Sequence, residues 1–170
     1  MPGSPDPILG SDAANVGVST LVAVLFVALP YLLRDRLDDS RRFALGGGLA
    51  YALTCLAAWA GSRVATDAFA AGMAADAGTF LGWSAAALVV LGAQAAIPYY
   101  CVARWRLVAP LAALFAVTVL ILPPFLSVRG ESDPLGLYVL VFGPLLVGLT
   151  CLGAVAEYVV RSVALGVGEE

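Results

Sequence analysis

The sequence contains no histidine and no lysine, and all nine of its basic residues are arginines. The absence of histidine excludes a bis-histidine haem, a histidine general base and the usual zinc sites. The absence of lysine excludes a retinal Schiff base and a lysine nucleophile. We therefore expect no cofactor and no metal site, and the composition favours a protein that is not an enzyme.

Charged residues are also scarce, at 12% of the chain against 61% hydrophobic residues. Soluble domains carry about 25% charged residues, and a fold of this size buries only about two-thirds of its extended surface. Only a lipid bilayer can cover this much apolar surface, so the sequence predicts a multi-pass protein of the cell membrane. The net charge of −3 argues against a nucleic-acid partner.

Cysteine is limited to three residues, Cys55, Cys101 and Cys151, and each lies in an apolar stretch. This odd number, without a CxxC motif, does not indicate a disulfide framework, and we expect small buried apolar side chains instead. The abundance of Ala, Val, Leu, Gly and Arg, together with acidic loops, is typical of a halophilic archaeon or a high-GC bacterium.

Five hydrophobic segments are long enough to cross the hydrocarbon core, which takes about 20 residues of helix. The sequence therefore predicts an all-α polytopic membrane protein with five transmembrane helices, in a single domain over residues 13–163. Residues 1–12 are predicted to be a disordered tail, and residues 164–170 a short C-terminal tail. Gly143-Pro144 predicts a bend in the last helix. The five predicted spans are 16–33, 43–61, 80–103, 107–126 and 135–160.

Arginine is distributed unequally between the predicted loops. Seven arginines fall on one side of the predicted membrane, and only Arg63 and Arg129 fall on the other. Because cytoplasmic loops carry the excess of basic residues, we expect the N-terminus outside and the C-terminus in the cytoplasm. The longest loop, over residues 63–79, is predicted to be either a short interfacial helix or a plain loop.

Two stretches of the sequence resemble each other. In each, a Leu-Pro pair (Leu29-Pro30 or Leu122-Pro123) precedes an arginine, and the next helix carries Leu-Thr-Cys-Leu. If the stretches are related, the first two helices and the last two form an inverted repeat, as in many transporters. The high content of Leu, Ala and Gly offers another explanation, and a match between Pro30-Tyr31 and Pro98-Tyr99 implies a different pairing.

Few polar side chains lie within the predicted helices, where they are costly and usually mark function. Gln94 either lines a cavity or forms an interhelical hydrogen bond, and we favour the hydrogen bond because a lone amide has no partner for chemistry. Thr54 and Thr150 are further candidate intramembrane positions. Glu157 precedes Arg161 by four residues, so the two are expected to form a solvated ion pair on one helix face.

Small residues recur at four-residue spacing along the predicted helices. Such residues let helix backbones approach closely, so they predict contacts within the bundle or between subunits. The candidate packing positions are Ala57, Gly61, Gly82 and Gly92.

The first predicted cytoplasmic loop carries Asp35, Asp38 and Asp39 among arginines. Clustered aspartates can hold Mg²⁺ against a lipid pyrophosphate, which would make the chain an enzyme that acts on lipid headgroups. Enzymes of that kind need two facing motifs, and the sequence has only one. We therefore favour a charge-balanced connector.

Together, these features favour a non-enzymatic membrane protein, namely an accessory, scaffold or small subunit that works through helix–helix contacts. Its expected partners are the lipid bilayer and either other membrane subunits or a second copy of the chain. The alternative is a transporter or channel for a small neutral or apolar solute, built on the inverted repeat. A lipid-headgroup enzyme is the third interpretation.

Overall fold

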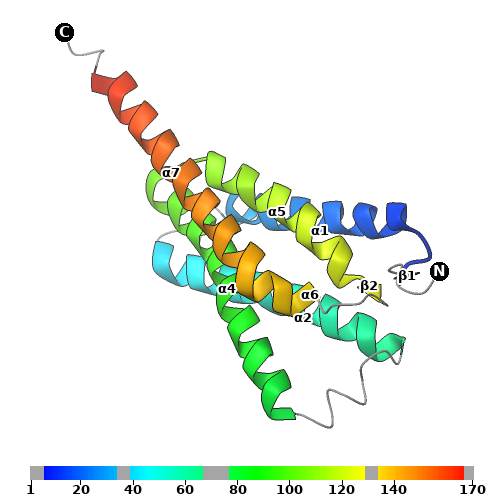
Figure 1. Ribbon diagram of the computed structural model, residues 1–170. Helices are drawn as coiled ribbons and strands as arrows, with labels where there is room; N and C mark the ends of the chain where they lie inside the picture. The colour runs from blue at the N-terminus through cyan, green and yellow to red at the C-terminus, as the bar shows by residue number, and fades with distance from the viewer. Residues whose placement is uncertain (1–5, 34–38, 67–76, 129–133, 167–170) are drawn as a thin grey trace.

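The computed structural model describes residues 6–33, 39–66, 77–128 and 134–166, so most of the predicted loop over residues 63–79 lies outside the described residues. The described chain is almost entirely helical, and its helices form one bundle (Figure 1). Two short strands, β1 (Asp6–Pro7) and β2 (Ser127–Val128), accompany the helices. The helices are α1 (Asp12–Leu32), α2 (Ser40–Ala65), α4 (Ala77–Trp105), α5 (Ala109–Phe125), α6 (Pro134–Leu137), the π-helix η2 (Tyr138–Phe142) and α7 (Gly143–Gly166).

Four helical stretches are long and apolar enough to cross a membrane: α1, α2, α4 and the continuous stretch from Pro134 to Ala164. This finding supports an integral, multi-pass membrane protein. The predicted fourth span, α5, has only 17 residues, which is at the short end of the length that crosses the hydrocarbon core. Five spans, the orientation and the cell membrane as location remain predictions.

The short helix α5 is the most interior helix of the bundle, because it contacts α1, α2, α4 and α7 and has the largest share of buried residues. One stripe along it is exposed, at Ala112, Ala116, Leu120 and Pro124. Pro110 fits in its first turn because the first N–H groups of a helix have no intrahelical partner. The core is thus built around α5, whose buried apolar side chains include Leu111, Leu114, Val117, Ile121, Leu122 and Phe125.

The segment before α1 is paired with the segment after α5. Strands β1 and β2 form an antiparallel ladder, and the Ile8 N–H group donates to the Leu126 carbonyl. Ser11 then caps α1 by accepting the Ala14 N–H group. The prediction of a disordered tail is therefore wrong for residues 6–12, because the strand that orders them is remote in the sequence.

Helices α2 and α4 approach closely through glycine. A Cβ atom added at Gly48 would lie 2.6 Å from the Gly92 carbonyl oxygen and 2.9 Å from the Ala96 Cβ atom. A Cβ atom added at Gly47 would lie 2.3 Å from the Tyr99 ring. That ring is held in place, because the Tyr99 hydroxyl donates to a backbone carbonyl of α1. Neither glycine therefore tolerates a side chain in this arrangement.

The close contact between α2 and α4 at Gly47, Gly48 and Gly92 is called the seam below. Three of the four predicted packing positions lie away from it. An added side chain at Gly61 or Gly82 would meet open space, and Ala57 is exposed. Only Gly92 faces another helix, with its added Cβ atom 3.9 Å from the Gly48 carbonyl oxygen. Among the described helices, no close approach occurs at Ala57, Gly61 or Gly82, because residue spacing does not reveal which face of a helix points inward. Contacts between subunits stay a prediction for them.

The last helical stretch becomes irregular just before Gly143-Pro144, where the sequence predicts a bend. The five residues of η2 precede Gly143, and the Gly143 N–H group donates to the Tyr138 carbonyl. Proline has no N–H group and its ring crowds the carbonyl four residues earlier, so a wider helical turn relieves the clash. A Cβ atom at Gly143 would lie 2.3 Å from Val90, so glycine allows α4 to pack against this turn.

The contacts between helices do not establish the predicted inverted repeat. Helix α1 packs mainly against α5, while α2 packs mainly against α4. The two threonines that the repeat would make equivalent also differ, since Thr54 is exposed and Thr150 is buried. The repeat therefore remains a prediction.

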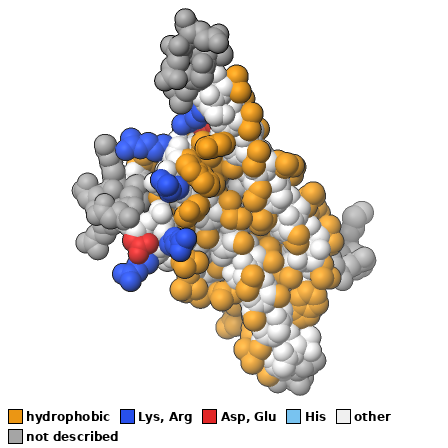
Figure 2. All heavy atoms as spheres, turned by 90° about the vertical axis from the view of Figure 1, so that its left-hand side faces the viewer, with side chains coloured by type: hydrophobic (Ala, Val, Ile, Leu, Met, Phe, Trp, Pro, Cys, Tyr) orange, Lys and Arg blue, Asp and Glu red, His pale blue; other side chains and the backbone are white. Residues whose placement is uncertain are grey.

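The described arginines are divided between the two ends of the bundle. Arg63, near the end of α2, is buried, and its guanidinium lies 4.6 Å from the centroid of the Trp59 ring. At the opposite end, where α2 begins and α4 and α7 end, Figure 2 shows basic side chains gathered beside a largely hydrophobic surface. The exposed arginines of this end are Arg41, Arg42, Arg104, Arg106 and Arg161.

Candidate functional site

Gln94, the uncharged amide in the middle of its predicted span, is fully buried between α4 and α7. Its Nε2 atom donates to Thr150 Oγ1 at 3.1 Å, and the Thr150 hydroxyl donates to the Leu146 carbonyl at 2.8 Å. Because the single threonine proton is used within α7, the Gln94 amide acts as the donor of the pair. Gln94 Oε1 has no hydrogen-bond partner within the described residues. The pair thus links two helices.

The other predicted polar positions do not converge on this pair. Thr54 is exposed on α2, and its hydroxyl donates to the Ala50 carbonyl at 2.9 Å. Glu157 lies further along α7 and is bonded to the start of α5. Of the four candidate polar positions, the structure brings together only Gln94 and Thr150.

A second group of buried polar side chains joins α2, α5 and η2. The Tyr51 and Thr118 hydroxyl oxygens are 3.0 Å apart. Thr118 donates to the Leu114 carbonyl, so Tyr51 is the donor between them. Cys55 and Tyr138 belong to the same buried cluster as Tyr51, and the Tyr138 hydroxyl has no hydrogen-bond partner among the described side chains and backbone.

Sequence reasoning missed this group of hydroxyls. Tyrosine near a helix end anchors a protein at the membrane interface, but Tyr51 lies in the middle of a predicted span. A tyrosine at that depth needs a hydrogen-bond partner, so the position of Tyr51 was a signal in the sequence from which a buried network could have been predicted. Its partner Thr118 belongs to the interior helix α5, which no sequence pattern marked as interior.

An apolar cavity of about 240 Å³ lies between the end of α5 and the turn formed by α6 and η2. The Tyr138 ring forms part of its wall and packs edge-on against Phe125, with ring centroids 5.8 Å apart. None of the four candidate polar positions lines it. The remaining lining residues are Leu120, Ile121, Pro124, Pro134, Leu137, Phe142 and Leu146.

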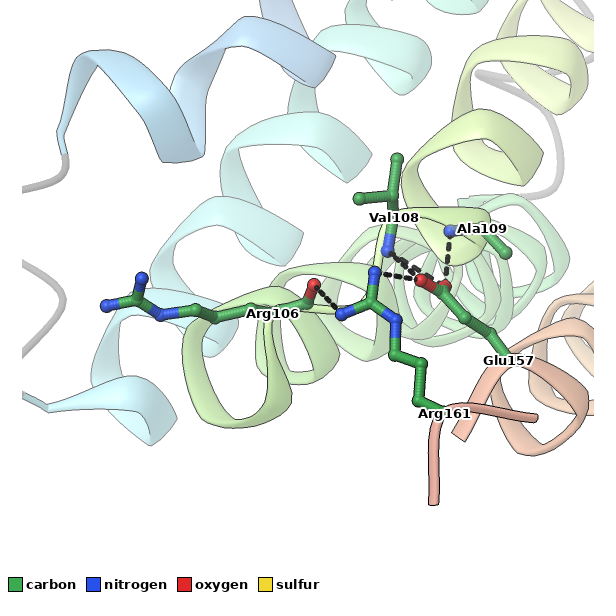
Figure 3. Close-up of polar contacts among 5 residues, drawn as sticks. All are labelled: Arg106, Val108, Ala109, Glu157 and Arg161. Carbon is green, nitrogen blue, oxygen red and sulfur yellow. Dashed lines mark hydrogen bonds and ion pairs between the residues drawn. The ribbon is translucent and has the colours of Figure 1, made fainter. Parts of the chain in front are cut away.

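At the arginine-rich end, Glu157 reaches from α7 to the start of α5 (Figure 3). Its carboxylate accepts the Val108 N–H group at 2.8 and 3.1 Å and the Ala109 N–H group at 2.7 Å. The first N–H groups of a helix lack intrahelical partners, and the helix dipole favours an anion there. The expected ion pair with Arg161 is present. It is not merely solvated, because only 17% of the Glu157 side chain is exposed.

The turn between α4 and α5 is also held from α7. Arg106 has a φ of 55°, in the left-handed region that residues other than glycine rarely adopt. Its carbonyl accepts a hydrogen bond from Arg161 Nη1 at 3.1 Å. Two side chains of α7, one acidic and one basic, therefore bind the turn and the helix start that follows it (Figure 3).

The other end of α5 is bonded in a similar way. The Ser62 hydroxyl of α2 lies 2.8 Å from the Phe125 carbonyl and from the Trp59 carbonyl of its own helix, so its single proton is shared between them. Asn15 of α1 donates to the Leu126 carbonyl at 3.1 Å. The last carbonyls of a helix have no intrahelical partner, and these side chains donate to two such carbonyls, of which that of Leu126 also accepts the Ile8 N–H group. Sequence reasoning missed both residues, although buried polar side chains normally have partners. Three other helices thus hold α5 at its two ends.

The aspartate motif is described only at Asp39, because Asp35 and Asp38 lie outside the described residues. The Asp39 carboxylate accepts the Arg42 N–H group and pairs with the Arg42 guanidinium, both at 3.1 Å. Asp39 is therefore the N-cap of α2. Over the described ranges, no group of three His, Cys, Asp or Glu residues is placed to hold a metal ion.

No family model, curated protein or solved structure matches this chain. Its function is therefore inferred from its own geometry.

Proposed function

We propose that this chain is a non-enzymatic accessory or scaffold subunit that acts in the membrane through helix–helix contacts. The observation that carries the proposal is the Gln94–Thr150 hydrogen bond, because it engages the amide at the middle of a predicted span in a link between α4 and α7. A transport site needs polar groups or irregular backbone beside a water-filled cavity near the midplane. Neither Gln94 nor Thr150 lines the described cavity.

The bonding of α5 also supports a scaffold. Alternating access requires one group of helices to rock or open against another. Here the start of α5 is bonded to α7 through Glu157, and its end is bonded to α2 and α1 through Ser62 and Asn15. A relative movement of these helices would break hydrogen bonds at the ends of the interior helix.

The outer surface of α7 supports a role in association. In a bilayer such a surface contacts either lipid or another membrane helix, and small residues nearby let a second backbone approach. On another helix, Gly82 of α4 also faces open space, which leaves room for a second backbone there. The large apolar side chains exposed along α7 include Leu145, Leu149, Leu152, Val155, Val159, Val160 and Val163.

A transporter or channel for a small apolar solute is the second candidate, and one observation favours it. Tyr138 and Phe142 of the π-helix line the apolar cavity, and π-helical turns are frequent at functional sites. A transporter would need Gln94 for solute passage, whereas a scaffold would need Gly82 for contact with a partner helix.

We expect Gln94→Leu to leave the protein folded and its associations unchanged. The substitution removes one interhelical hydrogen bond, which costs about 0.6–2 kcal/mol in membrane proteins. The measurements are the thermal midpoint in detergent and the glycerol permeability of proteoliposomes. Thr54→Val, which removes a hydroxyl from an exposed position, is the matched control. A glycerol flux that only Gln94→Leu abolishes would favour the transporter instead.

We expect Gly82→Leu to weaken association without affecting folding. The added side chain meets open space within the chain, so the thermal midpoint should be unchanged. The same side chain would hold a partner helix away from α4, and we expect association to weaken about tenfold. Light scattering and recovery of co-purifying membrane subunits measure this loss. Gly17→Leu, which also meets open space but lies on α1, is the control, and equal behaviour of the two variants would contradict a contact through α4.

A further inference from the structure

Pro30 lies inside α1, close to the end of the helix at Leu32. In an unbroken α-helix, each backbone N–H group donates to the carbonyl four residues earlier. Pro30 has no N–H group, so the Phe26 carbonyl loses its intrahelical donor. An unpaired carbonyl is costly inside a bilayer, and Phe26 lies within the first predicted span. This carbonyl therefore needs a donor from outside α1.

Tyr99 of α4 supplies that donor. Its hydroxyl donates to the Phe26 carbonyl at 2.8 Å, and its side chain is fully buried. The acceptor is the carbonyl that lies four residues before Pro30. A side chain of a neighbouring helix thus replaces the hydrogen bond that the proline removes from α1.

Both partners of this bond are positioned by α2. The Tyr99 ring occupies the space beside Gly47, where an added Cβ atom would lie 2.3 Å from it. It also packs against Phe43, with ring centroids 5.4 Å apart. The Phe26 ring packs edge-on against Tyr51, with centroids 5.1 Å apart. The hydroxyl and the carbonyl are therefore held facing each other by the packing of three helices.

The two Pro-Tyr pairs of the sequence take different parts in this contact. Tyr31, which follows Pro30, is 60% exposed, whereas Tyr99, which follows Pro98, is fully buried. The first pair supplies the proline of the contact, and the second pair supplies the tyrosine.

We propose that Pro30 and Tyr99 form a hinge and its latch, which hold the end of α1 closed against α4. Helix α1 packs mainly against α5, and Asn15 bonds its start to the Leu126 carbonyl. The bond from Tyr99 ties its other end to α4. A helix bends most easily at a proline, because the hydrogen bond that would stiffen it there is missing. When the latch opens, the last turns of α1 move while its start stays in place.

A double-mutant cycle tests whether the hydroxyl acts through the proline. Tyr99→Phe is compared in the unmodified chain and in a Pro30→Ala chain, by reversible unfolding in mixtures of SDS and neutral detergent. With Pro30 present, we expect Tyr99→Phe to raise the unfolding equilibrium constant about tenfold, because the Phe26 carbonyl is left unpaired. In the Pro30→Ala chain a backbone N–H group pairs that carbonyl, so we expect only about a twofold rise. Equal rises in both chains would overturn the proposal.

Amide hydrogen exchange tests the hinge itself. In Tyr99→Phe we expect the amides of residues 27–33 to exchange about tenfold faster. Those of residues 16–22 should keep their rates, because the bond from Asn15 remains. The matched control is Tyr100→Phe, which removes a hydroxyl from the next residue of α4 and should leave both rates unchanged. Unchanged exchange at residues 27–33, or equally faster exchange along all of α1, would overturn the hinge.

Discussion

Gly48→Leu should force α2 and α4 apart and unfold the bundle at temperatures where the unmodified protein is stable. The first atom of the new side chain would lie 2.6 Å from the Gly92 carbonyl oxygen. A backbone atom cannot move aside as the end of a flexible side chain can. Overpacking of a core costs about 1–3 kcal/mol and occasionally more, and we expect this substitution to reach at least 3 kcal/mol because it acts on backbone.

The thermal midpoint in detergent and the reactivity of Cys55 measure this effect. Cys55 is a free, fully buried thiol on α2, so in a Cys101→Ala/Cys151→Ala background it should react with maleimide only after the helices separate. Gly46→Leu is the matched control, because its side chain meets open space two residues earlier on α2. Leucine is a better helix former than glycine, so an equal loss of stability in both variants would show that the contact with Gly92 is not its cause.

Glu157→Ala should destabilise the arginine-rich end by about 2 kcal/mol. It removes the acceptor of the Val108 and Ala109 N–H groups and leaves the start of α5 uncapped. Hydrogen bonds to a charged group contribute about 1.5–3 kcal/mol. The exposure of Val108 places the effect toward the lower part of this range, although the Glu157 side chain is only 17% exposed.

Comparison with Arg161→Gln separates the cap from the ion pair. This variant keeps the carboxylate on the two N–H groups but loses the bonds from Arg161 to Glu157 and to the Arg106 carbonyl. Because exposed ion pairs contribute about 0–1 kcal/mol, we expect a smaller loss than for Glu157→Ala. Thermal midpoints at low and high salt measure both variants. A larger loss for Arg161→Gln would show that the turn at Arg106, rather than the helix start, limits stability.

The Glu157 and Arg161 variants both test how α5 is held. The sequence of this helix does not differ visibly from those of the other predicted spans. Residues 107–126 form an almost unbroken apolar stretch, which predicts a span like the others. The structure instead packs one side of α5 against four helices and bonds its ends to side chains from three of them. Its 17 residues therefore need not present a lipid-facing surface on every side.

The sequence by itself determined the class of protein and the approximate places of its long helices. Each of the five predicted spans corresponds to a described helical stretch, with ends that differ by a few residues. The sequence also placed Glu157 beside Arg161 and identified Gly143-Pro144 as an irregular position. These features depend on local composition and helical periodicity, which act over one or two dozen residues.

Only the tertiary structure decided which face of each helix points inward. In water, an apolar stripe marks the buried face, but lipid tails are as apolar as a protein core. The small residues Gly61 and Gly82 therefore look like Gly48 in the sequence, although only Gly48 lies in the seam. The bonds made by Asn15 and Glu157 likewise join residues that are far apart along the chain. Local sequence patterns cannot indicate them, because these bonds exist only once the helices have packed.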